Sequence, residues 1–222
     1  MSEILTETCI PLMPPKQPKH YLPLSPPHRT DILDNKPPEV VDIALFVLQR
    51  LSVKLIEWQG LAHRRMNVPI LLRDYSYLVP DTQVLQASKV LSQLGLPLED
   101  PSTHVISISG DFDSRGEYYR ITRHTSPFLL QYIVIYPQSF ATISDAELEE
   151  TTPSHILSPC CSKVFVPTVP AIYASIMRMM LNYPQHSPTM YQLQSDLSEL
   201  IGYHLLGLSG AMLARTKRRS GK

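Results

Sequence analysis

Residues 68–95, VPILLRDYSYLVPDTQVLQASKVLSQLG, decide the fold of this chain. The stretch opens with two short apolar runs, 68–72 and 77–79, which predict extended strand. Pro80 and Asp81 end the second run, and a helix is expected to begin there. Asp81 is a suitable N-cap because its carboxylate can accept hydrogen bonds from the free amides of a first helical turn. The predicted order is therefore strand, sharp turn, helix.

The helix after this turn carries its own signals of direction and length. Apolar residues recur on one helical face, as expected for a helix packed on a core: Val84, Ala87, Leu91 and Leu94. Gly95 suits the position just after a helix, where a left-handed backbone is common, and Pro97 blocks continuation. The start, the apolar stripe and the stop agree on one element.

The residues before this unit predict one long helix over 37–66. Two prolines at 37 and 38 suit a first helical turn, and apolar residues continue at helical spacing beyond Trp58. Trp58 is the single tryptophan and is expected in the core. The cations of residues 63–65 (HRR) suit the negative end of a helix.

The middle of the chain predicts strands. Residues 104–109 and 117–123 alternate apolar and polar positions, and 110–116 between them has turn composition, which together predict a β-hairpin. Residues 129–136 are almost all apolar and favour a central strand that is covered on both faces.

The last third predicts a short capped helix over 144–150 and an edge strand over 163–167, which Pro167 ends. Two helices, 170–183 and 189–206, are expected to close the domain. In the second of these helices, Asp196 is placed on the face opposite the apolar stripe.

Together these elements predict an α+β fold, a mixed sheet of about four to six strands with packed helices. Hydrophobic residues make up 43% of the 222 residues and charged residues 18%, which favours a globular body. We expect a proline-rich, extended N-terminal arm over 1–36, a single domain over 37–210 and a basic tail over 211–222.

The arm and the tail each have two interpretations. Three PxxP motifs lie in the arm, at 11–14, 15–18 and 23–26, and favour polyproline II conformation. The arm is then either a ligand for an SH3- or WW-type domain or simply an extended segment. The basic tail is either a solvated end or a patch for nuclear import or nucleic acid.

Bulk properties restrict the environment of the protein. The net charge is zero, so beyond the basic tail no field that would attract nucleic acid is indicated. Three cysteines are no disulfide framework and fit a reducing compartment. The first residues do not read as a signal peptide, and no run of about 18 apolar residues predicts a membrane span. We expect a cytoplasmic or nuclear protein without membrane contact.

Motifs of known chemistry are sparse. The sequence contains no GxGxxG, no Walker A pattern, no GxSxG elbow and no HExxH. His155 with Cys160 and Cys161 is the one local group of soft ligands, but adjacent cysteines are poorly placed to bind one zinc ion, and no metal site is expected. Asp111 and Asp113 follow a predicted strand. They either hold Mg²⁺ from one face of an extended chain or belong to a polar hairpin turn.

The order of elements, with Tyr77-Leu-Val-Pro-Asp81 and Val90-Leu-Ser-Gln-Leu-Gly-Leu96, resembles the nucleotidyltransferase-like superfamily, in particular its fungal members. The resemblance spans about residues 40–208. It implies a Gly-Gly or Gly-Ser pair before an Asp-x-Asp strand and a third carboxylate on a later strand. At the Asp-x-Asp position this chain has Asp74-Tyr75-Ser76, without a preceding glycine pair, and residues 132–134 contain no acid.

These departures favour a degenerate catalytic site, that is, a pseudoenzyme, because two-metal phosphoryl transfer needs carboxylates for both ions. Our leading hypothesis is a non-catalytic nucleotidyltransferase-like domain that acts by macromolecular interaction, with an unknown partner for which a protein is one candidate, and without a cofactor. One alternative is an active Mg²⁺-dependent nucleotidyltransferase that uses Asp74 with Asp111 and Asp113. Another is an adaptor that works through the proline-rich arm.

Overall fold

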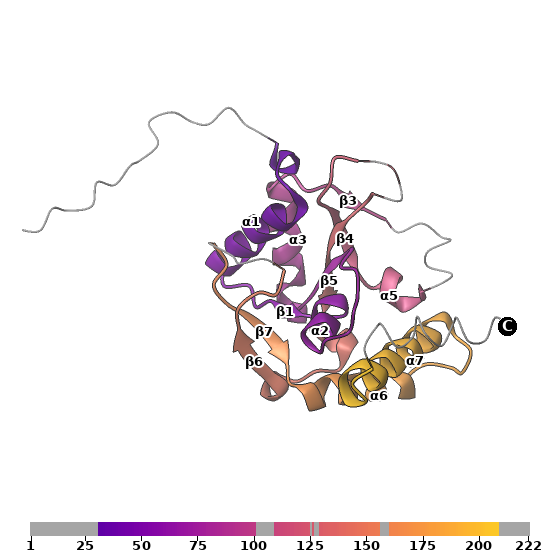
Figure 1. Ribbon diagram of the computed structural model, residues 1–222. Helices are drawn as coiled ribbons and strands as arrows, with labels where there is room; N and C mark the ends of the chain where they lie inside the picture. The colour runs from indigo at the N-terminus through magenta and orange to yellow at the C-terminus, as the bar shows by residue number, and fades with distance from the viewer. Residues whose placement is uncertain (1–30, 101–108, 125, 127–128, 156–159, 209–222) are drawn as a thin grey trace, which may run out of the picture. The chain divides into compact units, whose positions relative to one another are not determined.

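The computed structural model of the protein describes residues 31–100, 109–124, 126, 129–155 and 160–208. Within these ranges seven strands form one mixed sheet in the order β3-β4-β5-β2-β1-β7-β6 (Figure 1). Along the chain, the strands are β1 (Ile56–Glu57), β2 (Tyr75–Val79), β3 (Leu98–Glu99), β4 (Glu117–Arg120), β5 (Tyr132–Pro137), β6 (Leu148–Thr151) and β7 (Val164–Pro167). The α+β fold predicted from the sequence is confirmed, with a slightly larger sheet.

The centre of the sheet is a parallel pair. Strand β5 runs parallel to β2, with Tyr77 beside Ile135 and Ser76 beside Val134. On the other side of β2 lies β1, which is antiparallel to β2 and parallel to β7. The interpretation of 129–136 as a central strand is therefore correct.

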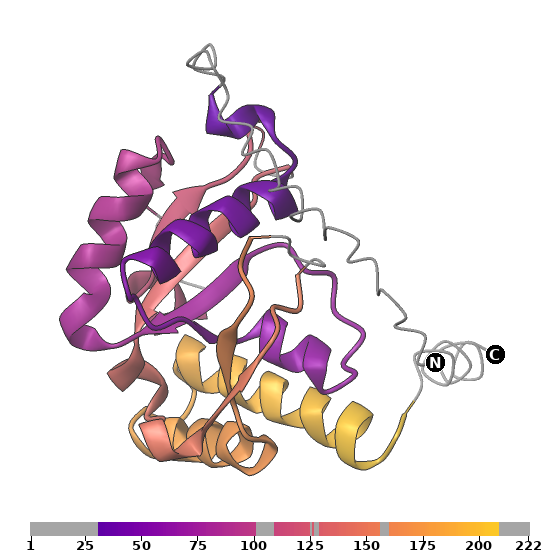
Figure 2. The ribbon, with the colours of Figure 1, turned by 90° about the vertical axis from the view of Figure 1, so that its left-hand side faces the viewer.

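Helices cover both faces of this sheet (Figures 1 and 2). Helices α1 (Pro37–Arg50) and α3 (Val84–Gln93) pack on one face, and their buried residues share a hydrophobic cluster with Tyr77. The opposite face is covered by α2 (Gly60–Arg65), α5 (Asp111–Ser114), α6 (Val169–Leu181) and α7 (Pro188–Leu200). Short 3-10 turns span Ile32–Asp34, Asp81–Gln83, Gln138–Ala141 and Asp145–Glu147, and a π-helical turn spans Ile201–Leu205. None of the helices in the described ranges combines the length and apolar character that crossing a membrane requires.

The prediction of one long helix over 37–66 is wrong. Helix α1 ends at Arg50, because Ser52 adopts a left-handed backbone with φ of 59°. The chain then forms β1 and starts a separate short helix, α2. Trp58, between these two elements, is buried as expected. Apolar residues at helical spacing continue across the break without a proline or glycine to mark it, which explains the error.

The stretch that decides the fold is partly as predicted. Residues 68–72 are not a strand, and Leu71 is 89% exposed; β2 begins at Tyr75 instead. Asp81 does not cap α3, because its carboxylate accepts a hydrogen bond from the Ser139 amide. The end of α3 is correct. Gly95 has φ of 86°, and the amide of Leu96 reaches back to the Leu91 carbonyl over 3.2 Å.

The predicted hairpin does not form in the described region. Residues 104–108 lie outside it, and residues 111–114 are the helix α5 rather than a turn. Strand β4 pairs antiparallel with β3 and with β5. The alternation in 117–123 therefore identified a strand correctly but did not identify its partners.

The C-terminal elements are close to prediction. The short capped helix of 144–150 is a 3-10 turn, closed by a capping box between Ser144 and Glu147, and β6 follows it directly. Strand β7 is not the edge strand that was predicted. It pairs with β1 on one side and β6 on the other, so β6 is the edge. Ser187 caps α7 by accepting from the Met190 amide at 3.2 Å.

Candidate functional site

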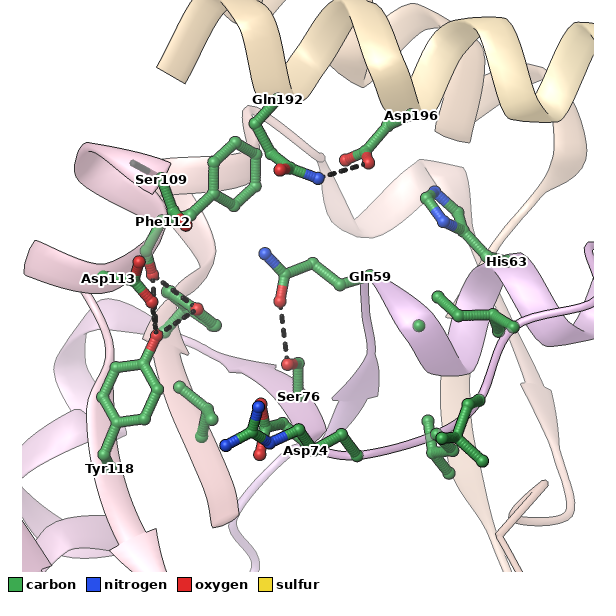
Figure 3. A pocket seen from close by; sticks show the side chains of 17 residues that line it. Gln59, His63, Asp74, Ser76, Ser109, Phe112, Asp113, Tyr118, Gln192 and Asp196 are labelled. Carbon is green, nitrogen blue, oxygen red and sulfur yellow. Dashed lines mark hydrogen bonds between the residues drawn. The ribbon is translucent and has the colours of Figure 1, made fainter. Parts of the chain in front are cut away.

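A polar cavity of about 250 Å³ lies on the sheet face that α2, α5 and α7 cover (Figure 3). Figure 3 shows that side chains from four directions surround it: Gln192 and Asp196 from α7, Asp113 from α5, Gln59 and His63 at α2, and Asp74 and Ser76 at β2. Three of these side chains are carboxylates. This concentration of acid makes the cavity the candidate site.

Asp74 lies directly before β2, and a residue of the neighbouring strand β5 holds its side chain in place. Its Oδ1 accepts from the Tyr132 amide over 3.2 Å. Burial raises the pKa of Asp74 to about 6, although the Arg73 charge and the Tyr132 amide lower it and the Asp113 charge adds slightly to the rise. At neutral pH this carboxyl group therefore retains a protonated fraction.

Ser76 occupies the second position of the strand, where the resemblance implies a second acid. Ser76 is 2% exposed, and its hydroxyl donates to the Gln59 side-chain oxygen at 2.8 Å. Gln59 has a left-handed φ of 48° and immediately precedes α2. Across the sheet Ser76 pairs with Val134, so neither strand supplies a further carboxylate here.

Asp113 enters the cavity from α5. Its Oδ1 accepts from the Tyr118 hydroxyl at 2.7 Å, whereas its Oδ2 is buried without a hydrogen-bond partner in the described structure. Gly110 holds α5 in place with φ of 61°. The next amide, of Asp111, donates to Thr189 of α7 at 2.9 Å.

Asp111 lies apart from the cavity. Its carboxylate accepts from the Tyr183 hydroxyl at 3.0 Å and pairs with Arg115 at 3.5 Å. The prediction placed Asp111 and Asp113 on one face of an extended chain. Residues i and i+2 of a helix do not share a face, and so the two carboxylates diverge. The structure thus brings Asp74 and Asp113 to one cavity and leaves Asp111 outside.

Asp196 was missed by the sequence analysis, which placed it on the exposed face of its helix. It is buried, and its Oδ1 accepts from Gln192 at 2.7 Å. Burial raises the pKa of Asp196 to about 7, with a further rise from Glu199 that the Gln192 hydrogen bond opposes. The spacing of Asp196 from Leu193 and Leu200, both buried, was the available signal.

His63 completes the wall near Asp196 (Figure 3). Burial lowers the pKa of His63 to about 4, so the imidazole is neutral at physiological pH. Arg73 is then the charged base among the residues that line the cavity. No group of three metal-binding side chains occurs in the described ranges, at this cavity or around His155 and Cys161.

A second cavity of about 660 Å³ lies near the start of α1. Apolar side chains dominate its described lining, among them Leu33, Leu71 and Leu129, and Arg123 and His124 add polar atoms. Leu71 and Leu129 are strongly exposed.

No family model and no curated protein matches the chain. Two solved structures do. The solution structure of the antibiotic-resistance factor ANT(2'')-Ia is 12% identical, with a TM-score of 0.40 over 82% of this chain and 95% of that one. The crystal structure of an antigenic nucleotidyltransferase-like protein from Paracoccidioides brasiliensis is 14% identical, with a TM-score of 0.42 over 74% of this chain and 75% of that one.

The chain resembles nucleotidyltransferase-like proteins. The resemblance suggested by the sequence is thus confirmed at the level of these matches. At such identities and TM-scores the likeness concerns the course of the chain.

Proposed function

We propose that this protein is a nucleotidyltransferase-like domain that binds a partner and does not transfer nucleotides. The observation that carries the proposal is the hydrogen bond from Ser76 to Gln59. The hydrogen bond makes a neutral, internally satisfied pair at the strand position where the resemblance implies a second carboxylate, and two-metal transfer uses carboxylates to hold both ions.

The neighbouring acids do not compensate for this serine. One oxygen of Asp74 already accepts a hydrogen bond from the Tyr132 amide. Asp113 shares one oxygen with Tyr118. Two-metal catalysis needs several ionised oxygens directed at a common point, and the described residues offer no cluster of three ligands.

Transfer is tested by incubating the protein with Mg²⁺ or Mn²⁺, each of the four radiolabelled ribonucleoside triphosphates, and candidate acceptors. We expect no labelled product and no release of pyrophosphate above the level of the Asp74→Asn variant. Turnover in the wild-type protein that is lost in Asp74→Asn would refute the proposal. Glu199→Gln, which removes one exposed charge outside the cavity, is the matched control.

A macromolecular partner is favoured by the apolar rim of the second cavity. Leu71 is 89% exposed, and large exposed apolar side chains beside a concave surface are typical of interaction sites. Co-purification from cells, quantified by mass spectrometry, compares the wild type with Leu71→Asp and with Leu85→Asp. Leu85 is 82% exposed on α3 and does not line this cavity, which makes it a matched control. Partners lost from Leu71→Asp and kept by Leu85→Asp support the assignment, and equal profiles contradict it.

A second candidate, an active Mg²⁺-dependent nucleotidyltransferase, is favoured by one observation. Asp74 and Asp113 line the same cavity, and the charge of Asp113 affects the pKa of Asp74. This candidate needs both carboxylates, so Asp74→Asn and Asp113→Asn should each abolish transfer.

The third hypothesis, an adaptor acting through residues 1–36, concerns residues that are almost all outside the described ranges. It stays a prediction that deletion of these residues removes partner capture and leaves folding intact.

A further inference from the structure

The cavity at β2 has an unbalanced set of charges. Asp74, Asp113 and Asp196 line it together with one arginine, Arg73. Arg73 is also engaged elsewhere, because its Nε donates to the Leu130 carbonyl at 3.2 Å. His63 adds no charge at physiological pH. The cavity therefore offers acceptors for a cation and disfavours a phosphate or any other anion.

One buried carboxylate oxygen in this cavity lacks a partner. Asp113 is 9% exposed, and its Oδ2 has no hydrogen bond within the described residues. Buried polar atoms of this kind are normally satisfied, because leaving one unpaired costs about 1–3 kcal/mol. A ligand that donates a hydrogen bond to Oδ2 would remove this cost.

The shape of the lining favours an organic cation over a metal ion. Mg²⁺ and Ca²⁺ take six or more oxygens in a compact shell, and no described cluster of three acidic or histidine ligands is present. The carboxylates instead stand on different walls, with Asp196 on α7 and Asp74 before β2 (Figure 3). Aromatic side chains lie among them: Phe112, Tyr118 and Tyr136. Aromatic faces attract ammonium groups and pack against alkyl chains.

We propose that this cavity binds a primary alkylammonium group, with the unpaired Oδ2 of Asp113 as its acceptor, Asp196 as a second negative charge on another wall, and the aromatic wall against its alkyl chain. The inference rests on the proposed function, because in a cavity that held a metal–nucleotide complex the same carboxylates would bind the metal ions instead. It gives the cavity a ligand class that fits a binding domain.

Two sources supply this chemistry. A lysine side chain of a partner protein carries the ammonium on a four-carbon stem, and a free polyamine carries several ammonium groups on short alkyl chains. The charge and the aromatic lining recognise both, and experiment separates them.

The test is isothermal titration calorimetry on the full chain at about pH 8 and low salt, where dissolved ions screen charge–charge interactions only weakly. One arm titrates spermidine, and the other titrates the peptide acetyl-Gly-Lys-Gly-amide. The same peptide with norleucine in place of lysine is the neutral control. We expect saturable binding in at least one of the first two arms and none with norleucine. Binding of the peptide alone identifies a protein source, and binding of spermidine alone identifies a free polyamine.

Variants assign the binding to the cavity. Asp113→Asn and Asp196→Asn should each weaken it by about tenfold or more, since each removes one negative charge from a partly desolvated site. Glu149→Gln removes the same charge from the exposed surface of β6, outside the cavity lining, and should change the affinity by less than about twofold. Thermal melts show whether each variant is folded, and the two aspartate variants act from different helices, so the loss of one to misfolding leaves the other. No binding in either arm, or binding that both asparagine variants retain, overturns the inference.

Protons provide a second readout. In the ligand-free cavity, burial raises the pKa of Asp74 to about 6 and that of Asp196 to about 7. A bound cation should drive these groups to ionise, so binding should release protons and tighten as the pH rises from 6 to 8. His63, already neutral, does not titrate in this window. Titrations in buffers of different ionisation enthalpy measure the protons released.

Magnesium–ATP is titrated separately, and this keeps the two proposals distinguishable. Tight binding that needs Asp74 would contradict the proposed function. Absence of amine binding together with absence of magnesium–ATP binding would contradict the further inference alone.

Discussion

The two faces of the sheet are built from the same strands but in different ways. On the α1 and α3 face, Tyr77 and its alternate neighbours in β2 join a closely packed cluster that is mainly hydrophobic. On the opposite face, Ser76 points to a polar cavity that α2, α5 and α7 surround. Successive residues of a strand point to opposite sides, so a single five-residue strand serves both regions.

This difference shows how stability and binding are separated in the molecule. The packed face supplies burial, the main favourable contribution to folding. The cavity face instead retains acids with raised pKa values and the unpaired, buried Oδ2 of Asp113, which cost stability in the free protein. Groups that are poorly satisfied in the free protein but close to one another are what a ligand can satisfy.

The largest expected effect comes from a substitution in the packed face. Leu45 of α1 is fully buried, and Leu45→Ala should lower the free energy of unfolding by about 2–5 kcal/mol. Leu193→Ala, equally buried on α7 but beside a small cavity that Asp196 also lines, should cost less because water can enter. Urea denaturation measures both. A greater loss in Leu193→Ala than in Leu45→Ala would contradict the contrast between the faces.

The next effect concerns the buried acid. An unfolded Asp196 ionises near its ordinary pKa of 3.8, whereas the folded group holds its proton until about pH 7. Between these values the unfolded state binds fewer protons, so this group lowers stability as the pH rises from about 4 to 7. Asp196→Asn should therefore match the wild type only below about pH 4, where the unfolded group is also protonated, and be more stable by about 2–4 kcal/mol near pH 8. Denaturation at several pH values tests this; a constant difference at all pH values would disprove it.

Two glycines with left-handed backbones give a matched comparison. A Cβ at Gly110 would overlap Thr189 of α7 and lie 2.9 Å from its backbone nitrogen, whereas a Cβ at Gly95 meets nothing within 4 Å. Gly95→Ala should cost about 1 kcal/mol, from backbone strain alone. Gly110→Ala should cost about 1–3 kcal/mol and shift α5 relative to α7. Thermal denaturation ranks the pair, and equal costs would show that this contact does not fix the cavity wall.

The smallest effect is the loss of a helix cap. Ser187 accepts from the Met190 amide at the start of the helix that carries Gln192 and Asp196. Ser187→Ala should cost about 1 kcal/mol. Ser198→Ala changes an exposed serine on the same helix and should stay within about 0.5 kcal/mol of the wild type. Two indistinguishable melting curves would mean that the cap does not support this wall.

The sequence predicted the packed face better than the cavity face. The apolar stripe of α3 was predicted from local spacing, and the end of the helix from the left-handed backbone that suits Gly95. Both predictions were correct. The break after α1 and the left-handed backbone of Gln59 have no marker in the sequence, because tertiary contacts impose them. The predicted strand at 68–72 failed for a similar reason, since apolar residues in a short run also suit an exposed loop.

The candidate site was predictable only in part. Asp74 could be predicted because it lies beside a strand that resembles the superfamily's Asp-x-Asp position. Asp113 could be predicted because it forms an acidic pair with Asp111 after a predicted strand, although the extended geometry expected for that pair was wrong. Asp196 belongs to a helix whose apolar stripe is clear, and its burial could have been inferred from Leu193 and Leu200. That residues 74, 113 and 196 line one cavity is a long-range result of the sheet order, which local patterns do not specify.

The central claim is that the cavity at β2 does not serve metal-dependent nucleotide transfer. It is tested most directly by thermal-shift titration with ATP, CTP, GTP and UTP, each with and without Mg²⁺. A ligand specific to the folded state adds about 2.7 kcal/mol of stability at a hundredfold excess over its Kd, which such a titration detects. We predict no magnesium-dependent shift with any nucleotide, in the wild type or in Asp74→Asn. A clear magnesium-dependent shift that Asp74→Asn loses and Glu199→Gln keeps would contradict the account and identify an active site.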